Sequence, residues 1–225
     1  MSAPAFTVLF DLDGTFLDTA PDMIAALNRL RQERDLAPLP DADLRGAVSH
    51  GSMAMIQAGF QLHPDDPDFA PLQHRFLNLY ERNLATLTRP FQGMDTVIDT
   101  LDQQHIRWGI VTNKPGYLTE PLLATLNLSQ RCACIISGDT LPQRKPDPEP
   151  LLHACRLAGG SPKYSIYVGD AERDIEAGRR AGMKTLAAMY GYISAQDPPE
   201  RWQADHLIQH PLDILARLQE YQAEV

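Results

Sequence analysis

The stretch Phe6-Thr7-Val8-Leu9-Phe10-Asp11-Leu12-Asp13-Gly14-Thr15 decides the fold of this chain. Its first half is a short run of apolar, β-branched and aromatic residues, which is typical of a buried strand in a parallel sheet. The run ends in two carboxylates, Asp11 and Asp13, followed by a glycine and a hydroxyl. Because open α/β sheets place their chemistry beyond the carboxyl ends of their strands, we expect this acidic pair to lie in a functional site.

Later segments repeat the strand pattern and alternate with helical patterns. The predicted strands cover 108–112, 134–137, 164–168, 185–189 and 205–208. The predicted helices of this part are one with a face made of Met94, Val97, Ile98 and Leu101, and those that cover 121–128, 149–158, 175–181 and 211–221. Repeated strand–helix units with short connections predict an α/β fold, a Rossmann-like parallel sheet with helices on both faces.

A segment after the first strand shows only helical patterns. One helix is predicted to start at Pro21, and two short ones cover 41–48 and 52–60. A longer helix is indicated by one apolar stripe, made of Phe69, Leu72, Phe76, Leu79 and Leu87. We therefore predict two domains, an α/β core formed by 1–17 and 90–225 and an inserted helical cap formed by 18–89.

Composition excludes several classes of function. The net charge of −9 argues against a nucleic-acid surface, which would need a basic patch. No apolar run approaches the length of a membrane span, and the first residues lack the features of a signal peptide, so we expect a cytoplasmic protein. The cysteines, Cys132, Cys134 and Cys155, are expected to be buried thiols rather than a metal site. Oligomeric state stays open between monomer and homodimer.

Complementary polar groups follow several of the predicted strands. Beyond Asp11 and Asp13, they are Thr112 and Asn113 after the second strand, Lys145 in a proline-rich loop, and Asp170 and Asp174 after the fourth strand. Parallel strands bring their carboxyl ends to one edge of the sheet, so these groups can converge there.

Such a set of groups has a definite chemistry. Several carboxylates repel one another unless a hard cation lies among them, and oxygen ligands without histidine or cysteine suit Mg²⁺ better than Zn²⁺. A lysine and a threonine beside the metal can bind phosphate oxygens. An aspartate in the same site can attack phosphorus, and a second carboxyl group can donate and accept the proton.

Each of these residues also has a simpler interpretation. The acidic pair alone could belong to a solvated turn, and Asp174 could serve only the first turn of a helix. Lys145 could be a plain surface lysine. His50, in Ser49-His50-Gly51, is the cap residue expected to face a substrate, although loop histidines are more often merely exposed. Lys114 is a weaker candidate for a substrate contact.

The motifs together resemble those of the haloacid dehalogenase superfamily, in its phosphatase branch. They are Asp11-x-Asp13-Gly14-Thr15, Thr112-Asn113, Lys145-Pro146 and Gly169-Asp170-x-x-x-Asp174, in the family's order. The resemblance implies a core of that family's fold with an inserted helical cap of type C1, which closes over the substrate and excludes water. Dehalogenases of the superfamily lack an acid two residues after the nucleophile, so Asp13 favours phosphoryl chemistry.

The resemblance also implies a role for each residue. Asp11 would be the nucleophile and Asp13 the general acid and base. Mg²⁺ would be held by the Asp11 side chain, the Asp13 backbone carbonyl and Asp170, with Asp174 supporting the metal and orienting Lys145. The phosphoryl group would be bound by Thr112, Asn113 and Lys145.

The substrate is expected to be a small phosphorylated metabolite. Length and cap placement resemble bacterial phosphoglycolate phosphatases, whereas the segment 189–193 and the tail 199–212 resemble N-acetylmuramic acid 6-phosphate phosphatases. Two alternatives stay open. One is a sugar phosphomutase of the same superfamily, which would need a bisphosphate activator, and the other is a non-catalytic protein that binds a phosphometabolite.

Overall fold

The computed structural model describes residues 5–194 and 197–224. In this part of the chain, six strands form one sheet in the order β5-β4-β1-β6-β7-β8, and every neighbouring pair is parallel. The strands are β1 Thr7–Phe10, β4 Arg107–Val111, β5 Cys134–Ile136, β6 Ser165–Gly169, β7 Lys184–Ala188 and β8 His206–Ile208. The predicted parallel α/β sheet is therefore confirmed, with β1 between β4 and β6.

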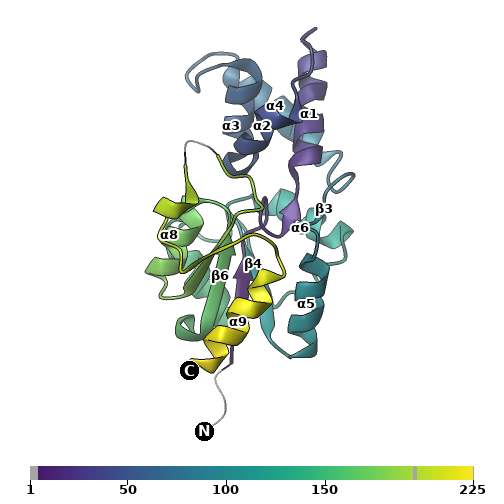
Figure 1. The fold of residues 1–225 in the computed structure, drawn as a ribbon. Helices are drawn as coiled ribbons and strands as arrows, with labels where there is room; N and C mark the ends of the chain where they lie inside the picture. The colour runs from purple at the N-terminus through teal and green to yellow at the C-terminus, as the bar shows by residue number, and fades with distance from the viewer. Residues whose placement is uncertain (1–4, 195–196, 225) are drawn as a thin grey trace.

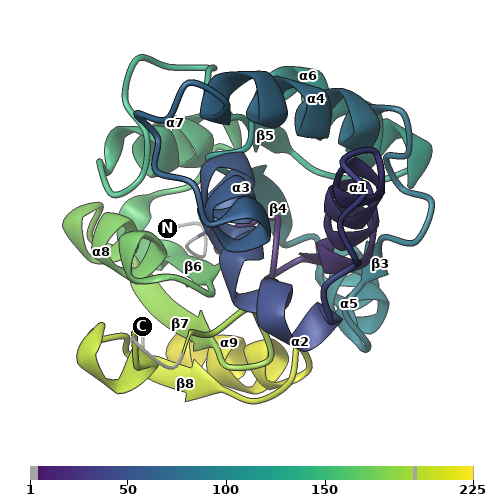
Figure 2. The ribbon, with the colours of Figure 1, turned by 90° about the horizontal axis from the view of Figure 1, so that it is seen from above.

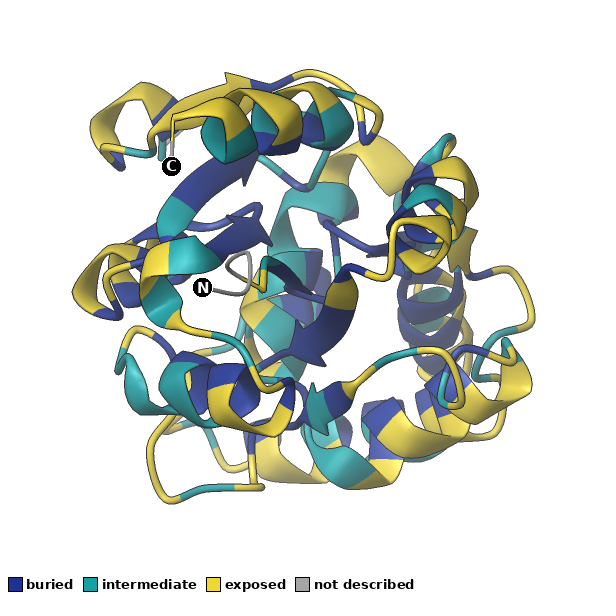
Figure 3. Ribbon diagram, turned by 90° about the horizontal axis from the view of Figure 1, so that it is seen from below, coloured by how far each residue is buried: buried dark blue, intermediate teal, exposed yellow. Residues whose placement is uncertain are grey.

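Helices cover both faces of the sheet, and β1 is therefore buried on both sides. Val8 and Phe10 pack on one face with α5 Met94–Gln103, α6 Gly116–Thr125 and α9 Asp213–Ala223. Leu9 points to the other face, toward α7 Glu149–Leu157 and α8 Glu172–Arg180. Figure 3 shows the buried strands in the middle and exposed outer surfaces on the helices. Short 3₁₀ turns occur at Pro162–Tyr164 and Pro199–Arg201.

The inserted helical segment stands over the carboxyl ends of the strands (Figures 1 and 2). It consists of α1 Ala20–Gln32, α2 Asp41–Leu44, a 3₁₀ helix at Arg45–His50, α3 Gly51–Phe60 and α4 Phe69–Glu81. These helices share a buried apolar cluster, to which Leu118 and Tyr192 contribute from outside the segment. Strands β2 Leu17–Asp18 and β3 Arg89–Pro90 pair antiparallel where the chain enters and leaves it.

The prediction that the last apolar stripe extends to Leu87 is wrong. Helix α4 ends at Glu81, and Leu87 is 53% exposed. The Asn83 side chain donates to the Leu79 carbonyl, and Ala85 adopts a positive φ of 61°, so the chain leaves the helix here. The carboxylate of Asp22 then accepts the backbone N–H groups of Leu87 and Thr88, which fixes the return toward β3.

Other helix boundaries also differ from the predictions. Helix α8 is Glu172–Arg180 rather than 175–181, and α9 is Asp213–Ala223 rather than 211–221. Helix α6 begins at Gly116 rather than at Pro121, which lies inside the helix and removes one backbone hydrogen bond there. The break expected at Ser49-His50-Gly51 is instead the end of the 3₁₀ helix, and α3 starts directly at Gly51.

The cysteines form no disulfide bond with one another. All three cysteines are free thiols, with Cys134 and Cys155 buried and Cys132 partly buried. Burial raises the pKa of the Cys132 thiol to about 11. Over residues 5–194 and 197–224, no helix has the length and apolar character needed to span a membrane.

Candidate active site

The loop after β1 turns sharply beneath the acidic groups. Asp11 is 3% exposed, and its backbone N–H donates to the Val168 carbonyl of β6 at 2.9 Å. Gly14 has a φ of +85°, and a Cβ at this position would lie 2.1 Å from Asp170 Oδ2. Only glycine therefore permits this loop to pass so close to Asp170.

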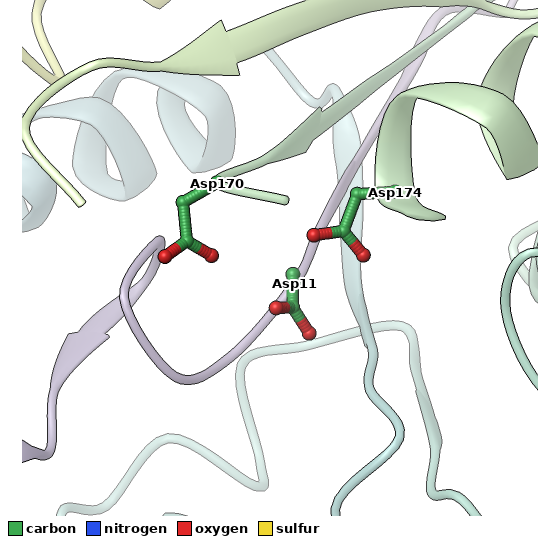
Figure 4. Close-up of side chains that lie close together, drawn as sticks. All are labelled: Asp11, Asp170 and Asp174. Carbon is green, nitrogen blue, oxygen red and sulfur yellow. The ribbon is translucent and has the colours of Figure 1, made fainter. Parts of the chain in front are cut away.

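Three buried carboxylates converge at the carboxyl ends of β1 and β6. Asp11, Asp170 and Asp174 each place a carboxylate oxygen within 4.8 Å of the others, and Figure 4 shows them facing a common space. Asp174 lies in the first turn of α8, and its Oδ2 accepts the Ala171 N–H at 3.1 Å. The predicted convergence of strand ends thus occurs for these three residues.

Asp170 is held from several directions. Its Oδ1 accepts the Thr15 hydroxyl at 3.2 Å, while Oδ2 accepts the Ser49 hydroxyl at 2.7 Å and the Tyr192 N–H at 2.9 Å. Burial, together with the nearby carboxylates of Asp11 and Asp174, raises the pKa of Asp170 to about 7. This carboxylate is thus poorly compensated without a cation.

Lys145 supplies the buried positive charge of the cluster. Its Nζ lies 2.8 Å from Asp11 Oδ1 and 2.7 Å from Asp174 Oδ1, and the side chain is fully buried. The ammonium also donates to the Val111 carbonyl at 2.8 Å and the Tyr167 hydroxyl at 2.7 Å. Burial still raises the pKa of Asp174, against the lowering effect of Lys145.

Thr112 and Asn113 follow β4 and border the same cavity as Asp11. The Asn113 side chain accepts the Lys145 N–H at 3.1 Å and donates to the Lys145 carbonyl at 3.0 Å. It therefore fixes the backbone of the loop that carries Lys145. Thr112 is buried, and its hydroxyl accepts the Lys114 N–H at 3.1 Å. The predicted phosphate contacts of both residues stay predictions.

The Asp13 carboxylate lies outside the acidic cluster. Its Oδ1 accepts the Thr19 hydroxyl at 2.6 Å and lies 3.0 Å from Lys114 Nζ. Lys114 Nζ also donates to the Tyr80 hydroxyl of α4 at 2.9 Å. Burial alone would lower the pKa of Lys114, but Asp13 and Tyr80 outweigh it and raise that pKa. The ammonium of Lys114 is thus already engaged, and its predicted contact with substrate stays a prediction.

A cavity of about 480 Å³ opens between the acidic cluster and the helical segment. Its core side includes Asp11, Asp13 and Thr112, and its helical side includes His50 and Gln73. Burial, followed by the charge of Arg173, lowers the pKa of His50. His50 thus lies at the cavity, and its predicted contact with a substrate stays a prediction.

Several residues of the site escaped the sequence-based prediction. Ser49 and Tyr192 contact Asp170, Arg173 donates to the Ser49 carbonyl at 2.7 Å, and Tyr80 contacts Lys114. Three of these residues adjoin sequence signals: Ser49 precedes His50, Arg173 precedes Asp174 within the last motif, and Tyr192 lies in the segment 189–193. Their contacts, like that of Tyr80, depend on how distant segments pack in the tertiary fold.

The raised pKa of Asp170 predicts how the stability of metal-free protein depends on pH. Between about pH 4 and pH 7, folded Asp170 keeps a proton that the unfolded chain has released, because the ordinary pKa is 3.8. Stability should therefore fall as pH rises through this window, by on the order of a few kcal/mol. Thermal melts in EDTA should show this loss, and the Asp170→Asn variant should reduce it. A wild-type melt that is flat across the window would contradict the assignment.

The chain is similar in sequence to known proteins. A sequence model of the haloacid dehalogenase-like hydrolase family matches residues 8–188. The chain is 42% identical over 208 residues to the N-acetylmuramic acid 6-phosphate phosphatase of Pseudomonas aeruginosa, with 92% of each chain covered. It is 48% identical over 204 residues to the phosphoglycolate phosphatase of Xanthomonas campestris, covering 91% of this chain and 92% of the relative.

The fold is likewise shared with solved structures. The crystal structure of a predicted phosphoglycolate phosphatase from Haemophilus somnus matches with a TM-score of 0.82 at 25% identity. The match covers 96% of this chain and 99% of that one. Sheet and helical segment are therefore both included in the likeness.

Proposed function

This chain belongs to the haloacid dehalogenase-like hydrolases, and we propose that it is a phosphatase that cleaves phosphomonoesters of small metabolites. The observation that carries the proposal is the placement of Asp11, a buried carboxylate at the end of β1 that contacts Lys145 and borders the cavity. The names of the relatives in Pseudomonas aeruginosa and Xanthomonas campestris, both phosphatases, support the same reaction.

The first step transfers the phosphoryl group to the protein. A carboxylate oxygen of Asp11 forms a bond to phosphorus while the bond from phosphorus to the ester oxygen breaks. The leaving alkoxide takes a proton from the Asp13 carboxyl group. Lys145 balances part of the charge on Asp11 and on the transferred group, and Thr112 and Asn113 bind its oxygens.

The second step releases inorganic phosphate. Asp13 accepts a proton from a water molecule, whose oxygen attacks phosphorus. The bond between phosphorus and the Asp11 carboxylate breaks, and Asp11 returns to its ionised form. Asp13 is thereby protonated again for the next turnover.

The acidic cluster fits a divalent cation. Asp11, Asp170 and Asp174 offer only oxygen atoms, and Lys145 is the buried lysine that contacts two of them. We propose Mg²⁺, held by the side chains of Asp11 and Asp170 and the backbone carbonyl of Asp13, with Asp174 in support. When bound, Mg²⁺ neutralises negative charge on the phosphoryl oxygens.

The helical segment acts as a cap over the cavity. We propose residues 18–89 as this cap and 1–17 with 90–225 as the core, so that β2 and β3 lie at the junction. A closed cap keeps water away from the leaving group and completes the walls of the site. A cytoplasmic location is part of the same proposal.

The size of the cavity favours the larger of the two candidate substrates. A space of about 480 Å³ lies within the range of pockets that hold drug-sized ligands, which is far more than a two-carbon acid phosphate fills. We therefore propose N-acetylmuramic acid 6-phosphate ahead of 2-phosphoglycolate.

A phosphate-release assay tests both the reaction and the substrate. With Mg²⁺ present, we expect kcat/KM for N-acetylmuramic acid 6-phosphate to exceed that for 2-phosphoglycolate or glucose 6-phosphate by about tenfold or more. EDTA should abolish release. Faster hydrolysis of 2-phosphoglycolate would contradict the substrate. Dependence on a sugar bisphosphate with little free phosphate would contradict the phosphatase itself.

A further inference from the structure

Tyr192 lies between the core and the start of the helical segment. It is 3% exposed and belongs to the stretch 189–193, which no step of the proposed reaction uses. Its hydroxyl donates to Asp18 Oδ1 at 2.7 Å and accepts the Ala20 N–H at 2.8 Å. One phenol group therefore binds both the end of β2 and the first residue of α1.

The ring of Tyr192 makes further contacts with the helical segment and its exit. The Arg45 guanidinium lies 4.9 Å from the ring centroid, and Arg45 also pairs with Asp18 at 3.0 Å. The ring of Phe91, which follows β3, is 6.2 Å away between centroids. Tyr192 thus contacts the chain where it enters and where it leaves the segment.

The backbone of the same residue contacts the acidic cluster. The Tyr192 N–H donates to Asp170 Oδ2, the oxygen that also accepts the Ser49 hydroxyl from the helical segment. A shift of the segment at Asp18 and Ala20 would have to break the phenol contacts or move Tyr192. If Tyr192 moved with the segment, its N–H would move relative to the Asp170 carboxylate that accepts from it.

We propose that Tyr192 is a positioning residue that couples the position of the helical cap to Asp170. The proposal rests on the proposed function, because the cap must close for turnover. Substrate binds the closed state, so a loosened junction lowers the population that binds and raises KM. Once substrate is bound and the cap is closed, the reacting groups are unchanged, and kcat should be nearly kept.

The test compares Tyr192→Phe with Tyr190→Phe. The Tyr190 hydroxyl is buried without a hydrogen-bond partner among residues 5–194 and 197–224, and its ring also packs on Phe91. Both variants therefore remove a hydroxyl oxygen from a tyrosine ring, but only Tyr192→Phe also removes hydrogen bonds. We expect Tyr192→Phe to raise KM about three- to tenfold with kcat changed less than about twofold, and Tyr190→Phe to change neither.

Amide hydrogen exchange gives a readout that does not depend on activity. Ala20 N–H loses its acceptor in Tyr192→Phe, so we expect faster exchange at Ala20 in this variant and not in Tyr190→Phe. Equal KM values for the two variants, or unchanged exchange at Ala20, would overturn the proposal. Absence of phosphate release by the wild type would instead overturn the proposed function.

A second variant removes the contact from the other side. Asp18→Ala deletes the acceptor of the Tyr192 hydroxyl, and we expect a similar rise in KM. Asp18→Ala also removes the pair with Arg45, and Tyr192→Phe also removes the acceptor of the Ala20 N–H. Because both variants remove the hydrogen bond between Tyr192 and Asp18, their combined effect on KM should still be less than multiplicative. Fully multiplicative effects would show that the residues act separately and would overturn the coupling.

Discussion

Replacement of Asp11 by asparagine is expected to reduce phosphate release by about 10⁴-fold or more, because an amide cannot attack phosphorus as a carboxylate does. The introduced amide keeps an oxygen that can accept from Lys145 Nζ, which lies 2.8 Å from Asp11 Oδ1. The variant also removes one of three mutually repelling carboxylates. The folded state should therefore be kept.

The controls separate chemistry from folding. Steady-state phosphate release gives the rate, and thermal melting should show a midpoint at or above that of the wild type. Asp95→Asn makes the same chemical change on the exposed surface of α5 and should leave both quantities unchanged. Activity of Asp11→Asn near the wild-type level would exclude Asp11 as nucleophile.

Replacement of Lys145 by methionine is expected to affect both stability and activity. The variant leaves Asp11 and Asp174 buried without the ammonium that lies within 2.8 Å and 2.7 Å of them. Loss of one partner from a buried ion pair costs about 3–5 kcal/mol of unfolding free energy. Phosphate release should fall at least about 100-fold, since a charge beside the transferred group is lost.

Urea unfolding in EDTA measures the stability of Lys145→Met. The loss should shrink toward acidic pH, because protonated carboxyl groups need no positive partner. Lys163→Met, on an exposed lysine, is the matched control and should change the unfolding free energy by less than about 0.5 kcal/mol. A Lys145→Met protein as stable as this control would contradict the role of Lys145 in the cluster.

The parts of the site that lie at strand ends could be predicted from the sequence. Asp11 and Asp170 directly follow β1 and β6, and Lys145 lies in the loop between β5 and α7. Because the strands are parallel, their carboxyl ends lie at the same edge of the sheet. The apolar runs before Asp11 and Asp170 are short and end at polar residues, so the sequence alone predicts that they form buried strands.

Contacts between distant loops could not be predicted in the same way. Tyr192 and Asp18 are 174 positions apart, and their hydrogen bond depends on how the helical segment sits on the core. The Asp13 carboxylate contacts Lys114 in the loop between β4 and α6, and Lys114 in turn contacts Tyr80 of α4. The sequence predicts too long a helix α4 because Leu87 continues the helical spacing of the apolar residues. In the structure the Asp22 carboxylate accepts the Leu87 N–H, and the helix ends at Glu81.

Identification of the phosphorylated residue tests the central claim most directly. The wild type, quenched with acid during turnover of N-acetylmuramic acid 6-phosphate, should carry an acyl phosphate that borohydride reduces to homoserine at position 11. Peptide mass spectrometry should find this change at Asp11 and not in the Asp11→Asn variant. Phosphate trapped on another residue, or turnover without any modification at Asp11 in rapidly quenched samples, would contradict the account.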